Sequence, residues 1–64
     1  MKNIYDSIKD ALLFFGPLDS QLILEKLELR GEKRSIPEIN AAKNLMLELG
    51  MIKRSTERGF VKIK

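Results

Sequence analysis

Cysteine and histidine are both absent from this 64-residue chain. Without cysteine the chain has neither a disulfide framework nor a thiolate metal site, and without histidine it lacks the commonest general base and the imidazole ligand. No hydrophobic run reaches the roughly 20 residues that a membrane-spanning helix needs. We therefore expect no enzyme activity, no metal, no cofactor and no membrane span.

Length and composition set the expected domain organisation. With 64 residues and 44% hydrophobic content, we expect residues 1–64 to form a single domain with one small core. The opening stretch MKNIYDSIKD carries acidic residues where a secretory signal has a basic head and an apolar segment. This pattern favours a cytoplasmic protein.

Positive charge is clustered in two segments. The formal net charge is only +3, but RGEKR at 30–34 holds three positive residues against one negative, and residues 53–64 hold five against one. Clustered positive charge attracts polyanions because it releases their counterions. A surface that serves only solubility is the alternative interpretation.

The first half of the chain predicts two helices. Gly16 and Pro17 end the first, over about 3–15, and Asp19 is suited to cap the second, over SQLILEKLEL, which ends near Gly31. Helical spacing places one apolar set on each helix. The expected buried residues are Ile4, Ile8, Ala11, Leu12 and Phe15 in the first helix, and Leu22, Ile23 and Leu27 in the second.

A third helix is predicted over about 35–49. Ser35 and Glu38 have the spacing of a capping box, Pro37 is tolerated in the first turn, and Gly50 ends the helix. Its apolar residues recur with helical period and are expected to face the core. They are Ile36, Ile39, Ala42, Met46 and Leu49.

The remaining stretch MIKRSTERGFVKIK predicts a β-hairpin. With Gly59 at the turn position that needs a positive φ, the two strands pair in a defined register. In this register Ile52 faces Ile63, Lys53 faces Lys62 and Arg54 faces Val61. The expected fold class is α+β, three helices followed by a two-stranded hairpin whose apolar face packs on the helices.

This order of elements, with the stretches LELGMIKR and GFVKIK, resembles the winged helix-turn-helix superfamily over nearly the whole chain. The resemblance implies a small bacterial or phage regulator of transcription that binds double-stranded DNA. It implies that the helix over 36–49 enters the major groove and that the hairpin, or wing, over 53–62 contacts the flanking backbone or minor groove. The connection RGEKRS is longer than a tight helix-turn-helix turn, which leaves the angle between the second and third helices open.

The exposed side of the third helix carries the predicted base-reading residues. Asn40 and Asn44 lie one turn apart with Lys43 beside them. An asparagine amide can donate and accept at once, which suits the major-groove edge of adenine, and a lysine can reach guanine or a phosphate. The alternative is that the amides are merely tolerated on a solvated face, and the nearby Glu48 would repel phosphates.

The predicted DNA backbone and minor-groove contacts come from the basic segments. Lys33 and Arg34 precede the third helix, whose N-terminal amides favour a phosphate, and Arg58 is placed at the tip of the wing. Lys53, Arg54 and Lys62 complete the set on the wing. Basic residues on an exposed strand also discourage aggregation, which is the alternative role.

Five apolar residues are expected to lie on the surface and to meet a protein. Tyr5, Leu13 and Phe14 predict a homodimer surface, and Leu47 and Phe60 predict contact with a partner. A winged helix that binds proteins without binding DNA is therefore the alternative function. RNA binding is a third possibility, although the hairpin lacks the aromatic pair that stacks bases.

Overall fold

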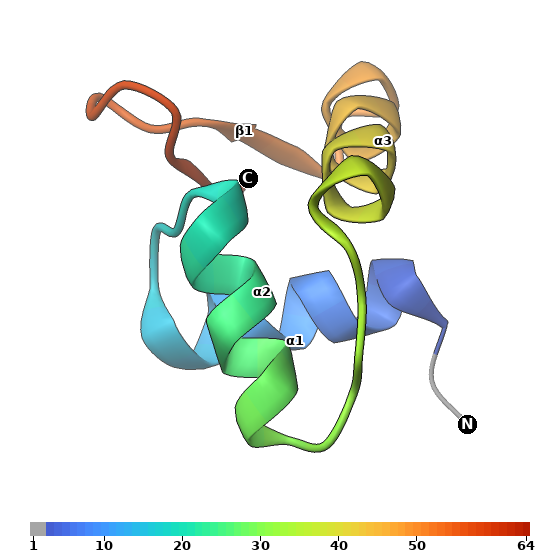
Figure 1. Cartoon of the computed structure of the whole chain (residues 1–64). Coiled ribbons are helices and arrows are strands. Elements are labelled where there is room, and N and C mark those ends of the chain that lie inside the picture. The colour runs from blue at the N-terminus through green and yellow to red at the C-terminus, as the bar shows by residue number, and fades with distance from the viewer. Residues whose placement is uncertain (1–2) are drawn as a thin grey trace.

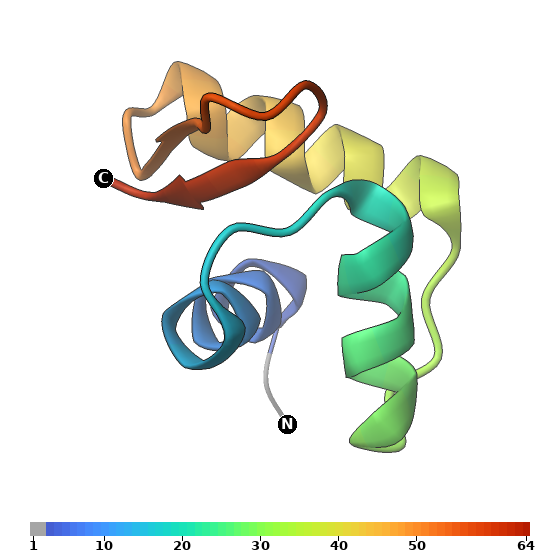
Figure 2. The same ribbon diagram turned by 90° about the vertical axis from the view of Figure 1, so that its left-hand side faces the viewer.

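The computed structural model describes residues 3–64. Its elements are α1 (Ile4–Phe15), α2 (Ser20–Leu29), α3 (Ile36–Glu48), β1 (Ile52–Arg54) and β2 (Val61–Ile63). The three helices enclose a small core, and the hairpin closes it from the side of α3 (Figures 1 and 2). The predicted α+β fold is confirmed, and its layout is consistent with a winged helix.

Local signals determine where the helices begin. The side chains of Asn3, Asp19 and Ser35 cap the three helices by accepting hydrogen bonds from backbone N–H groups in the first turns. At α3 the capping box is complete, because Glu38 also accepts from the backbone of Ser35 at 3.0 Å. Each cap satisfies donors that have no partner within the helix, so each predicted helix start is confirmed.

The hairpin has the predicted register. Ile52, Lys53 and Arg54 pair with Ile63, Lys62 and Val61 in antiparallel order. Gly59 has φ +83°, which a glycine adopts at little cost. The register therefore turns Ile52 and Val61 into the core, where both are buried.

An additional backbone contact, which the sequence did not predict, anchors the wing. Leu18, in the link between α1 and α2, exchanges two backbone hydrogen bonds with Val61, at 3.1 and 3.0 Å. A two-stranded hairpin alone is marginally stable in water. The bridge to Leu18 and the packing of the hairpin on α1 and α3 hold the wing in place.

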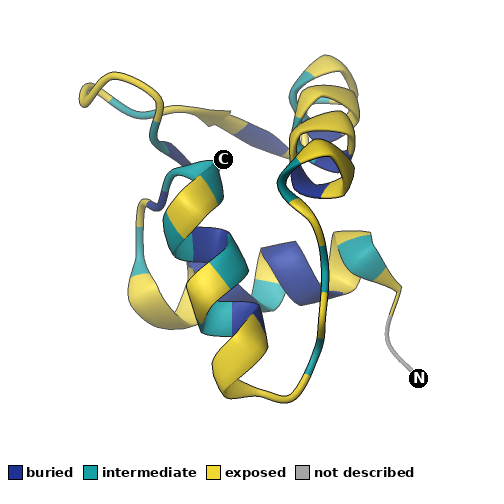
Figure 3. Ribbon diagram, viewed as in Figure 1, coloured by how far each residue is buried: buried dark blue, intermediate teal, exposed yellow. Residues whose placement is uncertain are grey.

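The core is formed by residues from every element (Figure 3). Its members are Ile8, Ala11, Leu12, Leu18, Ile23, Leu27, Ile39, Ala42, Met46, Ile52 and Val61. Five residues of the predicted core differ: Phe15 and Leu49 are exposed, and Ile4, Leu22 and Ile36 are half-buried. Leu47, predicted on the solvent side of α3, instead packs against the core.

The exposure of Leu49 has a physical reason in the packing of α3. The N-terminus of α2 and the wing cover the side of this helix that carries Lys43 and Leu47. The buried face of α3 is therefore centred nearer to these two residues than to Leu49, which is 65% exposed. Helical periodicity gives the width of a stripe, but the neighbouring elements decide where its centre lies.

Candidate nucleic-acid interface

The N-terminus of α2, the middle of α3 and the tip of the wing meet at one place. A shallow hollow of about 330 Å³ is lined there by Asp19, Ser20, Gln21, Ile36, Lys43 and Gly59. These residues are far apart in sequence, and they include parts of α3 and of the wing, the two elements that the resemblance assigns to DNA contact. The fold therefore brings the third helix and the wing onto a shared surface.

Two of the three predicted base-reading residues are held by α2. The Lys43 ammonium donates to the Ser20 hydroxyl at 2.7 Å, and the same hydroxyl donates to Oδ1 of Asn40. Asn44 is exposed, and no hydrogen bond to its side chain is found within residues 3–64. Ser20 is a polar contact that the sequence did not reveal, because nothing in the local pattern of α2 indicates which side chain of α3 it meets.

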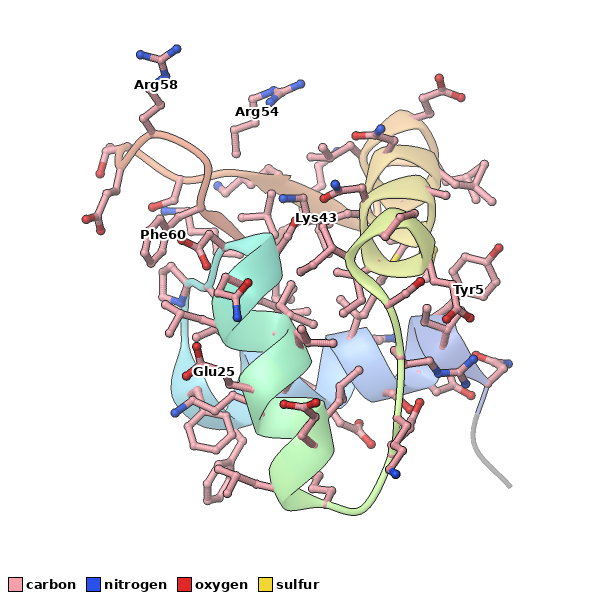
Figure 4. The ribbon with its side chains drawn as sticks, in the orientation of Figure 1. Tyr5, Glu25, Lys43, Arg54, Arg58 and Phe60 are labelled. Carbon is pink, nitrogen blue, oxygen red and sulfur yellow. The ribbon has the colours of Figure 1, made fainter. Side chains whose placement is uncertain are left out.

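The electrostatic environment of Lys43 connects α3 to the wing. Partial burial lowers the pKa of Lys43 below its ordinary value, Asp19 opposes this shift, and the positive charge of Arg54 adds to it. In Figure 4 Lys43 lies between α2 and α3, with Arg54 above it on the wing. Two cations from different elements thus share one region, where an anion would relieve their repulsion.

The wing presents a cluster of exposed positive charge. Lys53, Arg54 and Arg58 are exposed and Lys62 is half-buried, and in Figure 4 the side chains of Arg54 and Arg58 project away from the helices. No salt bridge to these four residues is found among the described part of the chain. Their role in DNA contact stays a prediction.

Arg34 is placed differently from the wing residues. Its Nε donates to Glu32 at 2.8 Å, and its guanidinium also lies 3.5 Å from Glu38. The hydrogen bond to Glu32 raises the pKa of Arg34, with both carboxylates contributing. Arg34 therefore braces the connection before α3, whereas the neighbouring Lys33 is exposed.

The capping carboxylate of α3 gives a prediction about pH. Hydrogen bonds from the backbone N–H and the hydroxyl of Ser35, aided by Arg34, lower the pKa of Glu38 below its ordinary 4.5. Because the folded state favours the ionised form, this contribution to stability is present above pH 4.5 and is lost as the pH falls through the lowered pKa. We expect urea unfolding to show that acidification lowers the free energy of unfolding less in Glu38→Gln than in the wild type. Glutamine can still cap the helix but cannot ionise. Parallel pH profiles for the two proteins would contradict this role.

The predicted dimer and partner residues do not form one surface. Tyr5 and Phe60 lie on opposite sides of the molecule in Figure 4, and Leu47 packs against the core. Leu13 and Phe14 are 64% and 73% exposed, and the exposed Phe15 ring contacts that of Phe14. We call Leu13, Phe14 and Phe15 the apolar patch; it lies at the C-terminal end of α1.

Basic side chains cover the rings of the apolar patch. The Phe14 and Phe15 rings meet edge to face, with centroids 4.8 Å apart. The ammonium of Lys26 lies 4.6 Å from the Phe15 centroid, and the guanidinium of Arg30 lies 5.8 Å from that of Phe14. These cation–π contacts shield the rings only in part, since both phenylalanines remain exposed.

Neither a metal-ligand group nor a membrane-spanning helix is found within residues 3–64. Within residues 3–64 no three Asp, Glu, His or Cys side chains are grouped so that they could bind a metal ion. Across the same residues, no helix combines the length and apolar character needed to cross a membrane.

Comparisons with protein-family models, with curated proteins and with solved structures gave no match for this chain.

Proposed function

We propose that this chain is a winged helix protein that binds double-stranded DNA and regulates transcription in the cytoplasm. In this proposal α3 enters the major groove and the wing contacts the flanking backbone or minor groove. The observation that supports it most is the junction of α2, α3 and the wing, where Lys43 and Arg54 lie within electrostatic reach of each other.

The proposed contacts follow from the positions of the side chains. Asn40 and Asn44 are exposed on α3 and would face base edges. Arg58 at the wing tip suits a narrow minor groove, and Lys33, Lys53, Arg54 and Lys62 would hold phosphates. Arg34 would act indirectly, since its ion pairs fix the start of α3.

Salt dependence gives a quantitative test of the proposal. The four proposed phosphate contacts and the cationic contact of Arg58, at about −0.9 each, predict that log K falls against log salt with a slope of about −4 to −5. Fluorescence anisotropy with a labelled random-sequence duplex at several salt concentrations measures this slope. An affinity that does not change with salt would exclude the proposed phosphate contacts.

A second candidate function, pairing with another copy of this chain, is favoured by the apolar patch. The hollow beside it is lined by Asp10, Leu13, Phe14 and Arg30, so it presents both signs of charge. A two-fold pairing would bury the exposed Leu13 and Phe14 side chains of the two copies against each other.

The oligomeric state tests this pairing. We expect sedimentation velocity to show dimers that form with increasing concentration for the wild type, and Phe14→Ser to remain monomeric because it removes the largest exposed ring of the patch. Leu49→Ser, which removes an exposed leucine on α3, is the matched control and should still dimerise. A wild type that is monomeric at every concentration would contradict the pairing.

A further inference from the structure

The hydrogen bonds among Lys43, Ser20 and Asn40 have a fixed direction. A lysine ammonium has only donors, so the Ser20 oxygen must accept from Lys43. The single hydroxyl hydrogen of Ser20 then points to the oxygen of Asn40. We call this chain of two hydrogen bonds the Ser20 relay. It links the first residue of α2 to two residues on α3.

The relay changes which group Asn40 can offer to a ligand. A side-chain amide has one oxygen that accepts and one NH₂ group that donates. The hydrogen bond from Ser20 holds the amide oxygen toward α2, so the exposed Asn40 turns its NH₂ group outward. Lys43 adds further donors beside it, because its ammonium carries three hydrogens and the Ser20 hydroxyl takes one. This part of α3 is therefore rich in donors.

The two asparagines of α3 consequently differ in chemistry. Asn44 lies one turn further along the helix, is exposed, and has no hydrogen bond to its side chain within the described residues. It retains both an acceptor and a donor, which is the pattern that adenine needs on its major-groove edge. Guanine presents two acceptors there, N7 and O6, and these match neighbouring donors.

We infer that Ser20 is a specificity-determining residue of the proposed DNA interface, because it makes Asn40 a donor that selects guanine while Asn44 selects adenine. This inference rests on the proposed function and deepens it. It replaces the expectation, drawn from sequence, that both asparagines read adenine. Ser20 acts through Asn40 and does not itself contact a base.

Selection of bound sequences from a randomised duplex library tests the inference. Asn40→Ala identifies the base position that depends on Asn40, and we expect the wild type to prefer guanine there. Ser20→Ala frees the amide to rotate, so the preference at that position should move toward adenine by about tenfold. Alanine is a good helix former at the start of α2, so the fold should be retained.

A neighbouring residue of α2 provides the matched control. Gln21 lines the same hollow, but its side chain donates to Glu25, not to α3. Gln21→Ala should therefore leave the guanine preference unchanged. A wild type that prefers adenine at the Asn40-dependent position, or a Ser20→Ala variant with unchanged preference, would overturn the inference.

A measurement without DNA separates this inference from the proposed function. In the free protein, Ser20→Ala should shift the NMR signals of the Asn40 side-chain NH₂ group and leave those of Asn44 unchanged. Unmoved Asn40 signals would show that the relay is absent and would overturn the inference, even if DNA binds. If the Asn40 signals shift but the wild type selects no duplex, the proposed function fails and the guanine preference fails with it.

Discussion

Replacing Arg54 and Arg58 together with glutamine is expected to weaken binding to duplex DNA roughly thirtyfold at about 0.15 M salt. Each cationic contact with the duplex raises the binding constant roughly fivefold at this salt concentration, because the counterion release scales as the −0.9 power of salt. The same substitution should make the slope of log K against log salt shallower by about 1.8. Both side chains are exposed and project from the wing, so the fold should be retained.

A variant with the same change in charge provides the control. Lys26 lies over the Phe15 ring and Arg30 over the Phe14 ring, near the C-terminal end of α2. This end of α2 points away from the wing (Figure 1). Their joint replacement by glutamine removes two positive charges and should change the affinity less than threefold. Equal losses in the two double variants would show that net charge, and not the wing surface, governs binding.

The second large effect is expected from a substitution on the buried face of α3. Ile39→Ala should lower the free energy of unfolding by about 3 kcal/mol, through lost burial and the cavity that remains. Ile39 is fully buried among residues of the single core. In a domain of this size such a loss is a large part of the total stability. Urea unfolding followed by circular dichroism measures the change.

Leu49→Ala is the matched control, because both residues belong to the same predicted apolar stripe. Leu49 is 65% exposed, so we expect its replacement to cost no more than about 0.5 kcal/mol. Similar losses for Leu49→Ala and Ile39→Ala would contradict the orientation of α3. A smaller loss for Ile39 than for Leu49 would place the core on the other side of the helix.

The sequence predicted the features of this fold that depend on neighbouring residues. The capping box of Ser35 and Glu38 needs only a spacing of three, and the hairpin register needs only a turn at Gly59 and an alternating pattern. Such signals act within one element, so they can be recognised before any packing is known. These elements agree with the structure for that reason.

Features that depend on contacts between elements were missed. The bridge from Leu18 to Val61 and the relay from Ser20 to Asn40 join residues at least twenty positions apart. The pairing of Arg34 with Glu32 depends on the path of the connection between α2 and α3, which also brings Glu32 to Ser7 of α1. No local pattern specifies these contacts. The sequence could therefore nominate candidate site residues, but it could not show which side chains would be their hydrogen-bond partners.

The most direct test of the proposed function is an NMR titration of the uniformly ¹⁵N-labelled chain with a random-sequence DNA duplex. We predict that backbone amide shifts change in two segments, 33–44 and 53–62, and that the signals of the apolar patch do not move. An absence of shifts at saturating duplex, or shifts confined to Leu13, Phe14 and Phe15, would contradict DNA binding by α3 and the wing.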